Sequence, residues 1–186
     1  GNCRMCLVEL KNSPKPIVSC AMNAKSCLTN GDVYTNSPLV KKARENVLEF
    51  LLLNHPLDCP VCDQAGECDL QNLSFEHGKL QQRFIEEKRV FEPEDIGDKI
   101  QLHMNRCIVC QRCVEVADQL TDGRVHGVLN RGDHSQISTC VSAAIDNEFS
   151  GNMIDVCPVG ALTDKTFRFK SRVWFNKPFN AHRECT

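Results

Sequence analysis

Thirteen cysteines in a chain of 186 residues restrict what this sequence can fold into more than any other feature. Several of them are separated by only two other residues, as Cys59 and Cys62 are, and this spacing lets two thiolates bind one metal centre. Secreted disulfide scaffolds usually have an even number of cysteines in a shorter chain behind a signal peptide. Here the number is odd, and the first residues contain neither a basic nor an apolar leader segment. The cysteines therefore favour metal sites over disulfides.

The remaining composition excludes several functions. With nine Phe, one Trp and one Tyr, the chain has little aromatic mass for a single large core, so metal centres are expected to help hold the fold. The formal net charge is −2 and there is no basic stripe, so nucleic-acid binding has no electrostatic support. The longest apolar run, residues 50–53, is too short to span a bilayer, so no direct membrane insertion is expected.

The residue pattern divides the chain into successive regions. Residues 1–36 read as short strands (6–10, 17–18 and 33–34) around a cysteine loop, and residues 37–80 as a helix followed by a cysteine-bearing segment. Ser37 and Pro38 are typical of the first positions of a helix, and His55-Pro56 is expected to end it. Residues 81–99 are highly charged and are interpreted as a linker with a surface strand. Residues 100–170 form a second cysteine unit, with turn signals at 122–123, 131–133 and 150–152.

The strongest metal motif is His55 followed by Cys59, Cys62 and Cys68. The first two cysteines can bind one centre, and the third can return to it if Gly66 lets the chain turn tightly. A cubane iron–sulfur cluster needs four protein ligands, and no fourth cysteine lies nearby. His55 is therefore the predicted fourth ligand of a [4Fe-4S] cluster. A neutral imidazole in place of a thiolate should raise the potential of that cluster.

The second motif is the triplet Cys107, Cys110 and Cys113, with a distant Cys157 before a proline. Bacterial ferredoxins use a similar triplet, with a fourth cysteine that binds a second cluster. That fourth position is Ala117 here. We therefore predict a ferredoxin-like fold that keeps one [4Fe-4S] cluster, which Cys157 completes. A structural zinc could also bind four cysteines, but zinc sites normally use two pairs.

The third motif is Cys3, Cys6 and Cys20, which fits a plant-type [2Fe-2S] pattern that lacks one ligand. Cys27, Cys140 and Cys185 have no partners at ligand spacing and are interpreted as buried or free thiols. No nucleotide-binding or serine-hydrolase motif is present. Arg106 and Arg112 flank the triplet and could either offset a cluster's negative charge or be solvated. The remaining histidines are expected at the surface, namely His77, His103, His126, His134 and His182.

Three segments, residues 1–9, 54–71 and 150–163, resemble the large iron–sulfur subunit of respiratory complex I, NADH:quinone oxidoreductase. The resemblance implies an α+β fold. Its parts are a remnant of a plant-type [2Fe-2S] ferredoxin (β-grasp) domain, a helical His-Cys3 [4Fe-4S] segment and a bacterial-ferredoxin-like domain with one [4Fe-4S] cluster. It also implies the same three ligand groups as the spacing does. By the same resemblance, residues 171–186 begin a large C-terminal region, and Cys185 belongs to a cysteine cluster there.

The resemblance further implies a place in electron transfer. Electrons would arrive from a flavin-bearing subunit that oxidises NADH and leave through downstream iron–sulfur subunits toward quinone. The chain would then be peripheral, on the NADH-oxidising face of the coupling membrane, and would have no substrate site of its own. The family's first [2Fe-2S] strands and its C-terminal region are missing, so we expect a piece of a longer protein or a split gene.

Three alternatives remain open at this point. The electron-input subunit of an NAD-linked hydrogenase or formate dehydrogenase shares the His-Cys3 segment. A zinc-stabilised interaction module would contain zinc and no iron. A disulfide scaffold would lose stability in a mild reductant without releasing metal.

Overall fold

A small antiparallel sheet opens the fold. Strand β1 (Leu7–Leu10) lies between β2 (Ile17–Val18) and β3 (Val33–Tyr34), and Leu7 is opposite Val18 in the register. Because strand side chains alternate between two faces, Val8 and Leu10 are buried while Leu7 and Glu9 are only partly buried. The three strands confirm those predicted from the sequence. The computed structural model describes residues 1–29, 31–121, 126–139 and 144–180.

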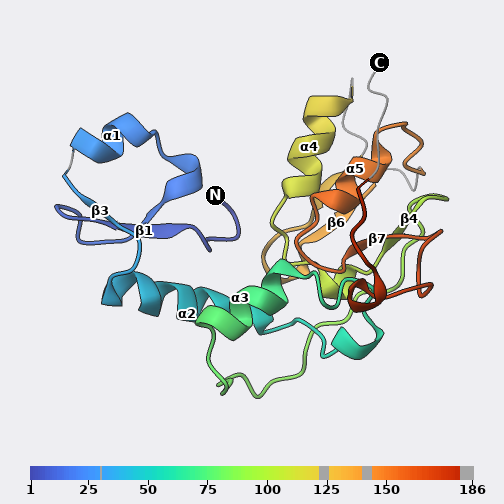
Figure 1. The fold of residues 1–186 in the computed structure, drawn as a ribbon, viewed down its shortest axis with the longest axis horizontal. Helices are drawn as coiled ribbons and strands as arrows, with labels where there is room; N and C mark the ends of the chain where they lie inside the picture. Colours follow the sequence, from blue (N-terminus) through green and yellow to red (C-terminus); the bar gives the residue numbers. More distant parts are fainter. Residues whose placement is uncertain (30, 122–125, 140–143, 181–186) are drawn as a thin grey trace.

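Helix α1 (Ala24–Thr29) lies between β2 and β3 in the chain, and α2 (Pro38–Leu52) follows β3. The predicted start of α2 is confirmed. Ser37 accepts a hydrogen bond at its hydroxyl from the Val40 backbone N–H at 3.2 Å, and Pro38 is the first helical residue. The helix ends at Leu52, three residues before the predicted stop. Helix α3 (Asp69–His77) packs beside α2 (Figure 1), and buried Leu48 and Leu70 share one apolar cluster between them.

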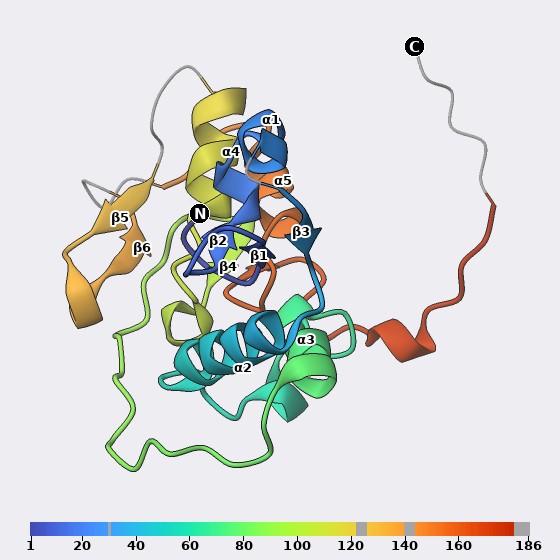
Figure 2. The same ribbon diagram turned by 90° about the vertical axis from the view of Figure 1, so that its left-hand side faces the viewer.

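The second half of the chain is built on two-stranded pairings. Strand β4 (Ile100–Leu102) pairs antiparallel with β7 (Leu162–Asp164), and β5 (Gly127–Leu129) pairs with β6 (Gln136–Ser138). Helices α4 (Arg112–Leu120) and α5 (Ser150–Asp155) pack against each other. Figure 2 shows the β5–β6 hairpin to one side of α4. The turn expected at 150–152 is wrong, because these residues begin α5.

The core of this second unit is an apolar cluster. Its buried members come from the strands, from α4 and α5 and from the end of the charged segment; they include Ile96, Ile100, Leu102, Val114, Ile137, Met153 and Leu162. Ala117, the position where a second ferredoxin cluster would take its ligand, lies in this core with 3 % exposure. Short 3₁₀ turns lie at Ser19–Ala21, Cys59–Val61, Met104–Arg106, Gly132–His134 and Val173–Phe175.

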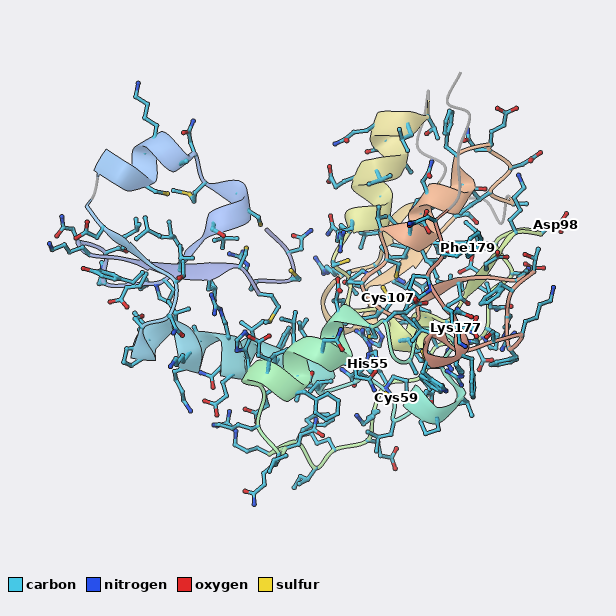
Figure 3. The ribbon with its side chains drawn as sticks, in the orientation of Figure 1. His55, Cys59, Asp98, Cys107, Lys177 and Phe179 are labelled. Atoms are coloured by element: carbon cyan, nitrogen blue, oxygen red, sulfur yellow. The ribbon has the colours of Figure 1, made fainter. Side chains whose placement is uncertain are left out.

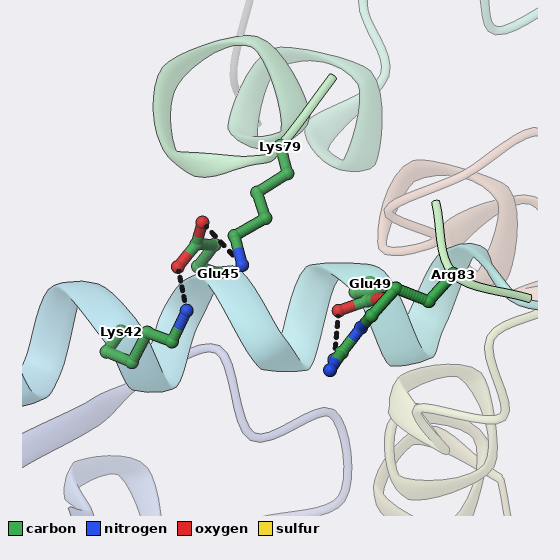
Figure 4. A network of polar contacts seen from close by, with 5 residues as sticks. All are labelled: Lys42, Glu45, Glu49, Lys79 and Arg83. Atoms are coloured by element: carbon green, nitrogen blue, oxygen red, sulfur yellow. Dashed lines mark hydrogen bonds and ion pairs between the residues drawn. The ribbon is translucent and has the colours of Figure 1, made fainter. Parts of the chain in front are cut away.

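The charged segment 81–99 contains no strand, so the expected surface strand is wrong. Polar contacts instead attach its beginning, and Lys79 just before it, to α2 (Figure 4). Arg83 contacts both carboxylate oxygens of Glu49, at 2.7 and 2.6 Å, and Lys79 lies 3.1 Å from Glu45. A strand forms only where a neighbouring strand supplies partners for its backbone groups, and here the partners of the segment are side chains of a helix.

The described end of the chain first contacts the cysteine-bearing loop and then leads away from the rest of the molecule (Figure 2). The Phe169 backbone N–H donates to Asp63 Oδ1 at 3.1 Å. The Arg172 guanidinium donates to the carbonyl oxygens of Cys62 and Pro60. In the part of the chain that the structure describes, no helix has both the length and the apolar character that crossing a membrane requires. Asp122-Gly123, Cys140, His182 and Cys185 lie outside the described residues.

Candidate metal centres

The four cysteines of the second motif converge on one pocket. Cys107, Cys110, Cys113 and Cys157 all line it, and most of the other lining residues are apolar, from Leu102, Ile108 and Ile137 to Val159, Ala161 and Leu162. The triplet lies on a tight loop that runs into the first turn of α4, and Cys157 follows α5. The structure therefore brings together thiols that are up to fifty positions apart in the sequence.

The loop that holds the triplet has an unusual backbone. Val109 and Gln111 have positive φ values of 51° and 65°. A β-branched residue rarely adopts this conformation, and doing so costs free energy. One result is that the Val109 backbone N–H donates to Cys107 Sγ at 3.3 Å. Hydrogen bonds from backbone amides to cysteine sulfurs are among the features that set iron–sulfur potentials.

Burial makes these thiols hard to ionise without a metal. Burial is the largest of the causes that raise the pKa of Cys107 to about 12; the neighbouring Cys157 and Cys110 also raise it, and the hydrogen bond from the Val109 backbone lowers it. Burial and the three other thiols likewise raise the pKa of Cys113 to about 12. Positive iron at the centre of the pocket would offset this cost because thiolates bind metal in their ionised form. The donor set therefore fits an iron–sulfur cluster.

Among the described residues, no three His, Cys, Asp or Glu side chains are arranged as ligands of a single metal ion. The convergence on one pocket is compatible with this finding, because each cysteine of a cluster binds a different iron atom rather than a shared ion. Eleven described cysteines are free, and none of them forms a disulfide with another.

The cysteines of the first motif also come together. Cys59 begins a 3₁₀ turn, and Cys68 stands directly before α3. Gly66 has a φ of +91°, which confirms the tight turn that returns Cys68 to the other two. Burial raises the pKa of Cys68, and the adjacent Cys62 and Cys59 raise it too, whereas backbone amides of Gln71 and Leu70 lower it. Cys62 and Cys68 are buried and Cys59 is exposed.

The His55 ring has a metal ligand's protonation state. Burial lowers its pKa to about 4, as do the charges of Lys88 and Arg106, while Asp58 acts in the opposite direction. The imidazole is thus neutral near pH 7 and has a free lone pair. Its Nδ1 is buried and has no hydrogen-bond partner in the described structure. One of the charges that act on the ring is that of Asp58, which directly precedes Cys59, and Figure 3 draws His55 and Cys59 in the same part of the molecule. The orphaned nitrogen fits the metal ligand predicted there.

The third motif is only partly assembled by the described residues. Pairing of β1 with β2 brings Cys6 to Cys20. Burial raises the pKa of Cys6, but hydrogen bonds from the backbone and side chain of Cys20 and from Ser19 outweigh it, so the net shift is downward. Cys3 lies near Cys110 of the second set. Burial is the largest cause of the raised pKa of Cys110, and the charges of Cys157 and Cys3 also raise it. Cys20 is exposed.

Pairs of charged side chains connect the first set of ligands with the second. Arg106 is 7 % exposed, so it is not the solvated surface residue that was one alternative for it, and it pairs with Asp58. Arg112 is half exposed and lies 3.8 Å from Asp69. Asp58 and Arg106 each stand one position before the first cysteine of a motif, which is the only sequence signal that could have indicated them.

The predictions for isolated residues had mixed outcomes. Cys27 is buried in α1 and His134 is exposed, as expected. His126 is 3 % exposed, so the surface position predicted for it is wrong. Apolar side chains from several strands and a helix enclose it, and a sequence with scattered histidines gives no indication of such packing. His77 and His103 are partly buried.

Two known protein families match the segments that contain the two four-ligand sets. Residues 97–163 match the family described as NADH-quinone oxidoreductase subunit 3, ferredoxin-like domain. Residues 44–83 match the NADH-ubiquinone oxidoreductase-G iron–sulfur binding region. The structure is also similar to a chain of an NAD+-reducing [NiFe]-hydrogenase crystallised in the H2-reduced state. The two share 27 % sequence identity and a TM-score of 0.79, over 93 % of this chain and 73 % of that one.

Curated relatives cover nearly the whole sequence. The NADH-ubiquinone oxidoreductase 75 kDa subunit of Reclinomonas americana is 53 % identical over 94 % of this chain and 25 % of its own length. The mitochondrial NADH dehydrogenase [ubiquinone] iron-sulfur protein 1 of Solanum tuberosum is 52 % identical over 94 % of this chain and 23 % of its own. A bacterial relative, from the NADH-quinone oxidoreductase of Rickettsia felis, is 51 % identical over 94 % of this chain and 26 % of its own. The chain thus spans about a quarter of the length of these relatives.

Fold, thiol sets and family matches together define an iron–sulfur protein region with a ferredoxin-like part. More specifically, residues 44–83 match the iron–sulfur binding region of NADH-ubiquinone oxidoreductase-G, and 94 % of the chain is about 50 % identical to part of the large iron–sulfur subunit of NADH:quinone oxidoreductase, also called the 75 kDa subunit. The recognition made from the sequence motifs is confirmed, and so is the mixed helix-and-sheet fold class at this coarser level.

Proposed function

We propose that this region carries electrons through iron–sulfur clusters within the peripheral arm of an NADH:quinone oxidoreductase. The observation that carries the proposal is the convergence of Cys107, Cys110, Cys113 and Cys157 on one apolar pocket. About 50 % identity to the curated members of the family supports it. The chain would act as one subunit of the enzyme and would itself have no substrate site.

Two sets of ligands would each hold a [4Fe-4S] cluster. One consists of His55, Cys59, Cys62 and Cys68, and it is supported by the unpartnered His55 Nδ1 and the close approach of the three thiols. The other consists of Cys107, Cys110, Cys113 and Cys157. When bound, each cluster would take up and release one electron. The protein's own part is to exclude water, to donate the Val109 amide to sulfur, and to place the Arg106 charge beside both sets.

A third cluster, of the [2Fe-2S] type, would use Cys3, Cys6 and Cys20 and a fourth ligand from outside this sequence. The contact of Cys6 with Cys20 and the proximity of Cys3 to Cys110 support this site. The three strands around it would then be a remnant of a plant-type ferredoxin domain, followed by the helical His-Cys3 segment and the bacterial-ferredoxin-like domain.

Similarity to these relatives suggests the partners. Electrons would come from a flavin-bearing subunit that oxidises NADH and pass on through downstream iron–sulfur subunits toward quinone. The chain would lie peripherally on the NADH-oxidising face of the coupling membrane. The likeness to an NAD+-reducing [NiFe]-hydrogenase supports a second candidate, an electron-transfer subunit of that enzyme class. The identity of 27 % to that chain, against about 50 % to the NADH:quinone oxidoreductase relatives, favours the first candidate.

The test is low-temperature EPR of the intact assembly, purified without oxygen and reduced with dithionite, together with an iron and zinc count. Two cubane signals with a slower-relaxing [2Fe-2S] signal are expected. Cubane signals alone would retain electron transfer and remove the third site. Zinc without iron would contradict the proposal and leave a zinc-stabilised interaction module. A co-purified [NiFe] catalytic subunit would favour the hydrogenase candidate.

A further inference from the structure

The segment 157–161, which we call the shared wall, lies between the two four-ligand sets. At its start, Cys157 belongs to the second set, and its side chain packs against both apolar clusters of the molecule. The Pro158 carbonyl oxygen accepts a hydrogen bond from the Asp69 backbone N–H at 3.1 Å, and Cys68 Sγ lies 3.7 Å from the same oxygen. The loop of the first set thus rests on the backbone that carries a ligand of the second.

Gly160 marks the closest approach within this wall. It is buried, and a methyl group added at this position would overlap Sγ of Cys62 and lie 3.1 Å from Cβ of Gln64. Its φ lies outside the left-handed region, so the backbone itself would accept alanine. The absence of a side chain therefore makes room for the Cys62 sulfur and does not serve a strained turn.

Cys62 has little freedom to move away from such a methyl group. Its side chain is 8 % exposed. Its carbonyl oxygen accepts a hydrogen bond from Arg172, and it also accepts one from the Ala65 backbone N–H at 3.1 Å. The Cys62 backbone N–H donates to the Cys59 carbonyl oxygen at 3.3 Å. Because both its N–H and its carbonyl group are held, an added methyl group would force the sulfur into another rotamer, away from the direction shared with Cys59 and Cys68.

We infer that Gly160 is a positioning residue for Cys62, so that the ferredoxin-like unit sets the ligand geometry of the His-Cys3 site on the neighbouring segment. The inference rests on the proposed function in that it treats Cys62 as a ligand. It goes beyond that function because a glycine that follows Cys157, a ligand of the second set, determines the position of a ligand in the first set. A consequence is that the two sites are built as one unit and are not independent modules.

The experiment uses Gly160→Ala in the intact assembly, purified without oxygen, with Gly151→Ala as the matched control. Gly151 is exposed in α5, has no positive φ, and has open space where a methyl group would go. Iron content and EPR are measured, and the signal of the first set is assigned by its shift in His55→Cys. In Gly160→Ala that signal should shift or fall about twofold or more, since a site needs its ligands within about 0.5 Å. The signal of the second set should persist.

A double-mutant cycle with Cys62→Ala provides a readout that needs no cluster. If the added methyl group meets Cys62 Sγ, Gly160→Ala should lower the melting temperature or the yield of the unaltered chain and have little effect in the Cys62→Ala background. Equal losses in both backgrounds would overturn the inference, and so would a Gly160→Ala protein that matches Gly151→Ala in iron and EPR. Unaltered protein without iron would contradict the proposed function, while the cycle would still test the contact.

Discussion

Nε of Arg106 lies 3.1 Å from Oδ2 of Asp58, across forty-eight positions of sequence. Arg106 directly precedes Cys107, and Asp58 directly precedes Cys59. One ion pair therefore joins the first cysteines of two ligand sets. The Arg106 side chain is 8 % exposed and that of Asp58 is 41 % exposed, so the pair is largely shielded on the arginine side.

Replacing Asp58 by Asn should destabilise the protein by about 1–3 kcal/mol, because it leaves the buried Arg106 charge without a counterion. The midpoint of anaerobic urea unfolding measures this change. Asp32→Asn is the control, since Asp32 pairs with Lys11 at 3.3 Å and both side chains are more than half exposed. That variant should lose no more than about 0.5 kcal/mol. Equal losses in the two variants would show that burial of Arg106 contributes nothing.

His55→Cys should keep its cluster and lower the cluster's potential. A thiolate in place of a neutral imidazole adds negative charge to the site, and the oxidised form is then favoured. An EPR-monitored redox titration gives the potential. His77→Cys, at the end of α3, controls for the addition of a thiol and should leave the potential where it was. If His55→Cys also leaves it there, His55 is not a ligand.

Cys110→Ala should lose one cluster and much of the stability of the second unit. Ligands bind only in the folded state, so their binding free energy contributes to folding. Cys27→Ala is the control because Cys27 is buried in α1 and lies outside all three ligand sets. Iron content and thermal unfolding are compared without oxygen. Normal iron and a normal melting temperature in Cys110→Ala would contradict the assignment of that set.

Stability should fall as the pH is lowered below about 6.5, the ordinary pKa of an exposed imidazole. Burial lowers the pKa of His126 in the folded protein, and Asp118 opposes this only in part. The unfolded chain therefore takes up a proton before the folded one does, which favours unfolding as the pH falls. The side chains that line the His126 cavity are otherwise apolar or hydroxylic, including Ile96, Ile137, Ser138 and Met153.

His126→Leu should reduce this pH dependence. The urea midpoint is measured at pH 7.5 and 5.5, and the loss between them should be smaller in the variant. Part of the loss should persist, because burial also lowers the pKa of His55 and that of His103. His134→Leu, at an exposed position, should lose as much as the unaltered protein. An unchanged loss in His126→Leu would mean that this imidazole does not titrate differently on unfolding.

Local signals were sufficient for some parts of the fold. Ser37 and Pro38 start α2 because a cap needs only its own first turn. Gly66 turns the chain as its position between Cys62 and Cys68 indicated. The spacing of the triplet with Cys157 predicted thiols that do line one pocket. In each case the structure depends either on a few neighbouring residues or on cysteine spacing that only a few kinds of metal site can use.

Other parts depend on contacts between distant residues. Arg106 is buried beside Asp58, with which it pairs, and His126 is buried because several strands and one helix enclose it. The beginning of segment 81–99 contacts α2 but forms no strand, because its partners are side chains such as Glu49 and not the backbone of another strand. Side-chain type alone does not report such packing. The ligand assignments stay predictions until metal is measured.

The shared wall also has a consequence for the order of synthesis. Pro158 contacts Cys68 across ninety positions, and Cys157 is the last cysteine of its set to be made. A growing chain that has released only the triplet has neither the fourth thiol nor the backbone on which the earlier loop rests. Iron delivered during translation would therefore meet one site that lacks its fourth ligand and another that has its ligands but not their supporting backbone, until residues 157–161 leave the ribosome.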